Sequence, residues 1–139
     1  MKSLSLLQIG NFVALIATLI MNGLSNSGIF PNTVGDLGNS RAIFFLPETY
    51  VFAIWGVIYV GLIGFAIYQL RPVAKANGTV DRVGYWFVLS CLANITWLVL
   101  FLYDLVWLST VAMLVILYAL IMIYRRLGIG QRTIDWQER

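Results

Sequence analysis

The chain carries aromatic and amide side chains at helical spacing, a combination that can bind a flat ligand. Asn94, Trp97 and Phe101 share one helix face with Ser90 and Asp104, within an arc of about 80° at 100° per residue. A tryptophan ring offers a stacking surface and an asparagine amide offers hydrogen bonds, so the pair suits a planar ligand with polar edges. The same face also suits packing between helices, with the amide bonded across the contact. The sequence leaves both interpretations open.

A second aromatic face lies in a run without charged residues from Tyr50 to Leu70. At 1.5 Å per residue the run is long enough to cross a hydrocarbon layer of roughly 30 Å, so it predicts a transmembrane helix. The residues on one face of this helix are Phe52, Trp55, Tyr59, Leu62 and Ala66. Gly61 and Gly64 lie close by, and their lack of a side chain allows another backbone to approach.

A polar stripe follows the first apolar run of the chain. Its members fall within an arc of about 80° and are Gln8, Asn11, Leu15, Thr18 and Asn22. Polar groups in lipid must face protein, water or a ligand, because the hydrocarbon cannot hydrogen-bond to them. The stripe therefore predicts either amides bonded to neighbouring helices or the wall of a pocket.

Several reactive arrangements are absent from the sequence. The chain has no histidine, which excludes His-ligated haem, the usual zinc sites and Ser-His or Cys-His nucleophiles. Its single cysteine, Cys91, allows no intrachain disulfide and no cysteine-cluster metal site, and we expect it to pack inside a span. There is also no glycine-rich phosphate loop and no carboxylate pair within one span. We therefore expect a protein that is not an enzyme and that holds no metal.

The composition is that of an integral membrane protein. Of the 139 residues 60% are hydrophobic and only 11% are charged, far from the values of soluble domains. The pI near 9.2 does not indicate a nucleic-acid partner, because the basic residues flank apolar runs and form no patch interleaved with aromatic residues.

The predicted fold is an all-α, four-helix transmembrane bundle in a single domain, residues 1–139. The expected spans are residues 4–24, 50–70, 84–102 and 106–124. Trp107, Thr110, Leu114 and Tyr118 lie on one side of the last span, and Asp104 marks a tight turn before it. Residues 25–49 form a long loop with apolar segments, residues 71–83 a short polar loop, and residues 125–139 a tail that lies along the membrane interface.

The basic residues predict the orientation of the chain. Four spans put eight of the nine basic residues on one side and leave Arg41 on the other. The positive-inside rule then places both termini in the cytoplasm, with loop 25–49 facing outward.

Two motifs carry a family resemblance. The first is Pro47, Tyr50, Val51, Phe52, Trp55 and Tyr59. The second, in the next helix, is Asn94, Trp97 and Phe101. In this order the two motifs resemble the second and third helices of the TspO/MBR family, the translocator or tryptophan-rich sensory proteins. The better-known members have further prolines around the first motif, whereas this chain has Pro47 alone, which resembles the divergent branch.

The resemblance implies a ligand and a site. The family is associated with porphyrins and other tetrapyrroles, with sterols, and with transport or sensory regulation, so the expected ligand is flat and apolar. By motif match the pocket is lined by Trp55, Tyr59, Asn94, Trp97 and Phe101, with Asn22 and Trp107 as further candidates. Loop 25–49 corresponds to a lid over this pocket, although its aromatic residues also suit a loop lying in the membrane interface.

An alternative of a different class is a structural subunit of a larger membrane complex, including a photosynthetic one. The well-known members of the family have five helices and this chain supplies four. It is then a short or truncated member, or a component whose missing wall comes from another chain. In that last case we expect a second copy or a partner protein to cover a polar face.

Overall fold

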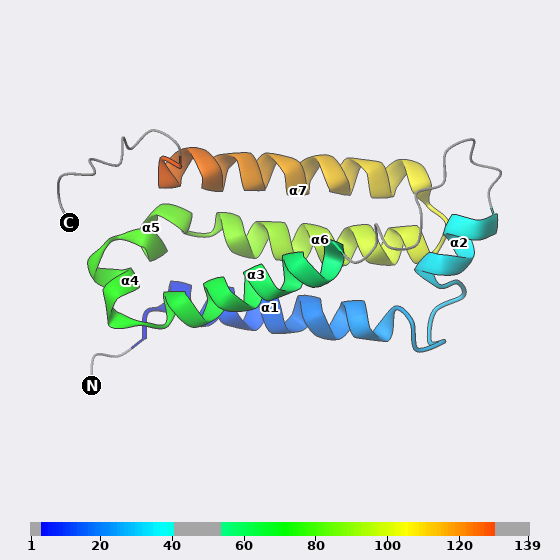
Figure 1. Ribbon diagram of the computed structural model, residues 1–139. Coiled ribbons are helices and arrows are strands. Elements are labelled where there is room, and N and C mark those ends of the chain that lie inside the picture. Colours follow the sequence, from blue (N-terminus) through cyan, green and yellow to red (C-terminus); the bar gives the residue numbers. More distant parts are fainter. Residues whose placement is uncertain (1–3, 41–53, 130–139) are drawn as a thin grey trace.

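The computed structural model describes residues 4–40 and 54–129, which form helices and contain no strand. The long helices run side by side along the molecule (Figure 1). The helices in chain order are α1 (Leu6–Leu24), α2 (Val34–Ser40), α3 (Ile54–Gln69), α4 (Pro72–Ala76), α5 (Thr79–Val83), α6 (Trp86–Leu102) and α7 (Val106–Leu127). The predicted all-α class is confirmed.

The long helices α1, α3, α6 and α7 correspond to the four predicted spans. Helix α1 packs against α3 and α6, and α6 packs against α7, while α4 and α5 close one end of the bundle and α2 lies at the other (Figure 1). Helices α1 and α7 are long and apolar enough to cross a membrane. Helices α3 and α6 are apolar but have only 16 and 17 residues, so the count of four crossings stays a prediction.

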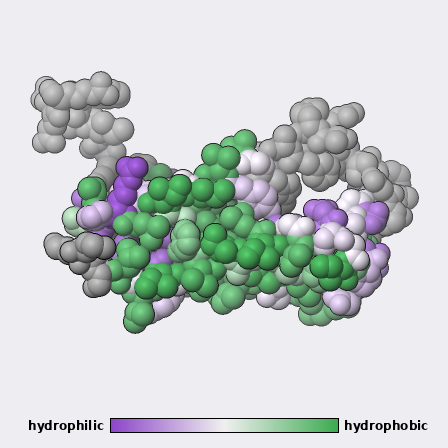
Figure 2. Space-filling view, turned by 90° about the horizontal axis from the view of Figure 1, so that it is seen from below, coloured by the Kyte–Doolittle hydropathy of each residue, from purple (hydrophilic) through white to green (hydrophobic). Residues whose placement is uncertain are grey.

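The surface of the bundle is apolar along the long helices and polar toward their ends (Figure 2). Figure 2 shows hydrophobic residues over the middle of the face that it displays, with hydrophilic residues gathered toward the two ends. Large apolar side chains are exposed along α7, among them Leu108, Val111 and Leu117. Contiguous exposed apolar surface of this kind is unfavourable in water and suits contact with lipid.

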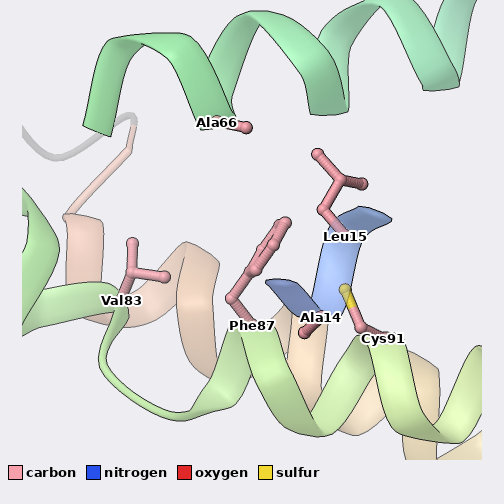
Figure 3. Close-up of a cluster of buried hydrophobic side chains, with 6 residues drawn as sticks. All are labelled: Ala14, Leu15, Ala66, Val83, Phe87 and Cys91. Carbon is pink, nitrogen blue, oxygen red and sulfur yellow. The ribbon is translucent and has the colours of Figure 1, made fainter. Parts of the chain in front are cut away.

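The buried apolar core lies where α1, α3, α5 and α6 meet. It consists of Ala14, Leu15, Ala66, Val83, Phe87 and Cys91 (Figure 3). The Phe87 ring packs on the Phe65 ring with 5.1 Å between centroids. Cys91 is buried in this cluster, in agreement with its predicted packing role.

The helix ends explain several boundaries. At the start of α1 the Ser5 hydroxyl accepts from the Gln8 N–H at 3.3 Å, and Gln8 Oε1 accepts from the Ser5 N–H at 2.8 Å. This reciprocal capping box satisfies two donors that the helix itself cannot. Between α6 and α7, Asp104 is exposed and has a φ of 62°, as the predicted surface turn requires.

The predicted loop over residues 25–49 is wrong in one part, because it contains the short helix α2. The sequence signal is local: the Thr33 hydroxyl accepts from the Asp36 N–H, and the Asp36 carboxylate accepts from the Thr33 hydroxyl and N–H. These bonds lower the pKa of the Asp36 carboxyl. Asn32 Nδ2 also donates to the Leu102 carbonyl at 3.0 Å, which ties the segment to the end of α6. Residues 41–49 of the predicted lid, with Pro47, lie outside the described residues, as do Phe52 of the predicted second span and residues 130–139 of the predicted tail.

The predicted polar loop over residues 71–83 is also wrong, because α4 and α5 occupy most of it. Pro72 begins α4, where its missing N–H costs no hydrogen bond. The predicted turn at Asn77 and Gly78 separates the two helices, and Gly78 has a φ of 66°.

Gly84, which joins α5 to α6, gives a prediction about folding. Its φ of 53° and ψ of −142° lie in a region that residues with a Cβ avoid, and a Cβ there would stand 3.3 Å from the Asp81 carbonyl oxygen. We expect Gly84→Ala to lower the free energy of unfolding by about 1–3 kcal/mol. Denaturation of the purified protein in SDS, followed by circular dichroism, measures the change. Gly61→Ala is the matched control, since a Cβ at Gly61 meets no described atom within 4 Å; an equal loss in both variants would contradict the prediction.

Candidate functional site

Three of the predicted site residues meet at one point of the bundle. The Tyr59 hydroxyl of α3 donates to Asn22 Oδ1 of α1 at 2.7 Å. Asn22 Nδ2 donates to Asn94 Oδ1 of α6 at 3.2 Å and to the Thr18 carbonyl at 2.8 Å. Asn22 therefore connects three helices, and both of its amide atoms are hydrogen-bonded.

The aromatic part of the site lies on α6, beyond Asn94. The rings of Trp97 and Phe101 are stacked, with 5.8 Å between centroids and 23° between planes. Asn94, Trp97 and Phe101 are each half-buried, so their edges stay accessible. Within the described ranges the Asn94 Nδ2 group has no hydrogen-bond partner, and it can donate to a polar group of a ligand. We call these five residues, Asn22, Tyr59, Asn94, Trp97 and Phe101, the amide–aromatic site.

Of the two remaining predicted residues, Trp107 does not join it. Trp107 is 88% exposed on the outer surface of α7. Trp55 lies one turn before Tyr59 in α3, and its side chain falls outside the described part of the chain. Gly61 and Gly64 also face open space: among the described residues no atom lies within 4 Å of a Cβ built on either.

A second amide cluster, which the sequence did not reveal in full, lies toward the other end of α1 and α3. Gln8 Nε2 donates to the Gln69 backbone carbonyl at 2.6 Å, and Asn11 Nδ2 donates to Gln69 Oε1 at 3.0 Å. Asn11 and Gln69 have no exposed surface. The stripe on α1 thus faces protein, and its first amides are used for packing between helices. Gln69 stands at the end of an apolar run, where a polar residue is ordinary at a membrane surface, so its type gave little signal.

Two cavities lie at the end formed by α4 and α5, away from the amide–aromatic site. One has a volume of about 540 Å³ and opens between the first turns of α1 and α6 and the last turn of α7. Another, of about 480 Å³, is bordered by Tyr68, Arg82 and Leu127. Neither was predicted from the sequence, because each is formed by residues from separate helices.

The chemistry available at the amide–aromatic site is binding. It offers stacked rings, a phenol and two amides, which can orient a flat molecule through its face and edges. Over residues 4–40 and 54–129 no group of three or more His, Cys, Asp and Glu side chains comes together as a metal centre needs.

Comparison with known proteins agrees with the two sequence motifs. A model of the family described as TSPO-like protein matches residues 8–139, well beyond the second and third helices that carry the motifs. Comparison with curated proteins gives no match, and neither does comparison with solved structures. The family match covers nearly the whole chain, and with the apolar helices it establishes that this chain is a membrane protein of the TspO/MBR family.

Proposed function

We propose that the protein binds a flat apolar ligand of the tetrapyrrole or sterol type at the amide–aromatic site. The observation that carries the proposal is the convergence of Asn22, Tyr59 and Asn94 beside the stacked rings of Trp97 and Phe101. The rings provide apolar contact over a large area, and the Asn94 amide fixes a polar edge. A porphyrin is the probe that fits this description best.

The biological role that accompanies such binding is transport or sensory regulation without catalysis. The site contains no nucleophile with a neighbouring base and no acid–base pair. We further propose that four helices cross the membrane with both termini in the cytoplasm. Arg71, Lys75, Arg82, Arg125 and Arg126 support this orientation, because all of them belong to the end of the bundle where α4 and α5 lie.

Removal of the tryptophan ring tests the proposal. We expect Trp97→Ala to weaken the binding of protoporphyrin several-fold, because the ligand loses one stacking face of about 1 kcal/mol. Titration of the detergent-solubilised protein, followed by quenching of tryptophan fluorescence and by the porphyrin absorption band, gives the affinity. Trp107→Ala is the matched control, since that side chain is exposed on α7. Unchanged affinity in Trp97→Ala would exclude Trp97 from the site.

One observation favours a second function, that of a subunit in a larger membrane assembly. Gly61 and Gly64 leave an open face on α3, with no described atom within 4 Å of a Cβ built at either of them. Such a face allows close approach of a helix from a second copy or from a partner protein. Size exclusion of the mildly solubilised protein from its native membrane, with an absorption spectrum across each peak, separates the functions. A small species with tetrapyrrole absorbance supports the binding protein, and co-elution with a large complex supports the subunit.

A further inference from the structure

The cleft of about 540 Å³ at the α4–α5 end combines a fixed positive charge with apolar walls. Its walls are formed by Leu7 of α1, Gly84 and Tyr85 of the α5–α6 junction, Trp86 and Leu89 of α6, and Arg126 of α7. It is separate from the amide–aromatic site, and the inference drawn from it does not depend on the proposed function.

Arg126 lies at the cleft beside an aromatic ring. Its guanidinium carbon lies 5.6 Å from the centroid of the Trp86 ring, at cation–π distance. Trp86 is in turn braced by the edge of Tyr118, with 5.6 Å between ring centroids. Nη1 of Arg126 lies 3.8 Å from the position of a Cβ built at Gly84, so the guanidinium reaches the α5–α6 junction. Arg126 is also exposed, so its guanidinium can donate to an anion that enters the cleft.

The charge around the cleft favours an anion. The described residues of this end include five basic side chains, Arg71, Lys75, Arg82, Arg125 and Arg126, against the single carboxylate of Asp81. Asp81 also lines the cleft. A carboxylate repels a bare phosphate but accepts hydrogen bonds from hydroxyl groups.

The walls of the cleft favour an amphiphile over a soluble anion. Leu89 is 39% exposed and Tyr85 is 73% exposed, and together with Leu7 they continue the apolar surface of the long helices up to Arg126. Trp and Tyr side chains are enriched at the headgroup level of membranes, and basic pockets between transmembrane helices bind anionic headgroups.

We infer that this cleft binds an anionic phospholipid whose headgroup carries hydroxyl groups, as that of phosphatidylglycerol does. Arg126 binds the phosphodiester with its planar fork, Asp81 accepts from the glycerol hydroxyls, and an acyl chain lies along Leu7 and Leu89. The occupant is a lipid of the surrounding bilayer, held in addition to any ligand at the amide–aromatic site.

Native mass spectrometry of the full-length protein, titrated in detergent with phosphatidylglycerol and separately with phosphatidylcholine, tests the inference. We expect phosphatidylglycerol to bind more tightly than phosphatidylcholine, and Arg126→Gln to weaken it about tenfold, as loss of a charge-assisted bond implies. Arg125→Gln is the matched control: it removes the same charge from the neighbouring position, which does not line the cleft. We expect it to weaken binding less than about threefold, by general attraction alone.

Two results would overturn the inference: equal affinity of the unmodified protein for the two lipids, or equal losses in Arg126→Gln and Arg125→Gln. Circular dichroism shows whether Arg126→Gln keeps its helices. If it does not, Arg126→Lys decides, since lysine keeps the charge over Trp86 but lacks the planar fork. We expect Arg126→Lys to weaken the binding of phosphatidylglycerol several-fold, and an affinity equal to that of the unmodified protein would count against the cleft.

Asp81→Asn tests the contact with the headgroup hydroxyls. It should reduce the preference for phosphatidylglycerol over phosphatidic acid, which has no headgroup hydroxyls beyond its phosphate, and an unchanged preference removes Asp81 from the site.

Discussion

Replacement of Gln69 by methionine should lower the free energy of unfolding by about 1–3 kcal/mol. The side chain has no exposed surface, and its Oε1 accepts the hydrogen bond of Asn11 Nδ2. Without that acceptor both polar atoms of the Asn11 amide are buried and unpaired, because Asn11 Oδ1 already has no partner among the described residues. Methionine has a similar shape, so packing changes little. Titration with SDS, followed by circular dichroism, measures the loss.

A double variant makes this prediction specific. Asn11→Leu combined with Gln69→Met replaces the two buried amides by apolar groups of similar size, and it also removes the unpaired Asn11 Oδ1 and Gln69 Nε2. Replacement of both partners can be nearly neutral or stabilising, whereas removal of one leaves the full cost of the other. We therefore expect the double variant to be more stable than Gln69→Met alone. The single variant Asn11→Leu completes the comparison. If the loss of the double variant equals the sum of the losses in Asn11→Leu and Gln69→Met, the two amides do not act as a pair.

Asn22→Leu should also lower the free energy of unfolding, because Asn22 is the only described residue that bonds to both Tyr59 and Asn94. We expect a loss of about 1–2 kcal/mol in unfolding free energy, at the upper end of the values for bonds between membrane helices. If the amide–aromatic site binds a porphyrin, Asn22→Leu should also weaken that binding several-fold, since Asn94 loses the contact that orients its amide.

Tyr59→Phe removes only part of the hydrogen bonding that Asn22→Leu removes, so it should cause a smaller loss of stability. It removes the hydrogen bond of 2.7 Å from the Tyr59 hydroxyl to Asn22 and keeps the ring. We expect about half the stability loss of Asn22→Leu, near 0.6 kcal/mol. A larger loss in Tyr59→Phe than in Asn22→Leu would show that the hydroxyl acts through some partner other than Asn22.

The polar residues of α1 were the most informative part of the sequence. An amide in lipid must face protein, water or a ligand, and in the structure Asn11 and Asn22 of the stripe bond to neighbouring helices. The need of polar groups for partners did not predict which face of α7 packs on the bundle, because apolar residues lie on all sides of this helix. Periodicity placed Trp107 on a face with Tyr118, but it could not show that this face points outward. For this reason the sequence placed Trp107 among the site candidates and the structure does not bring it there.

Short helices were the other point where sequence patterns were insufficient. Segments rich in Gly, Asn and Ser indicated loops, yet α2 forms because Thr33 and Asp36 cap it reciprocally, a signal of only two residues three positions apart. Which residues line the cleft beside Arg126 depends on the packing of α1, α5, α6 and α7, a long-range property that no local pattern contains.

The two amide clusters also determine how far α3 can slide along α1. Asn11 and Asn22 are separated by a rise of about 16 Å along α1, and their partners Gln69 and Tyr59 by about 15 Å along α3, in the opposite chain direction. Lipid chains are as apolar as leucine, so the free energy of contact between apolar helix faces differs little from one axial position to the next. A shift by one turn, about 5.4 Å, would separate Asn11 from Gln69 and Asn22 from Tyr59 at the same time. The two antiparallel helices are thus fixed in a single register, and an error in their docking during membrane insertion would leave polar side chains without hydrogen-bond partners at both ends.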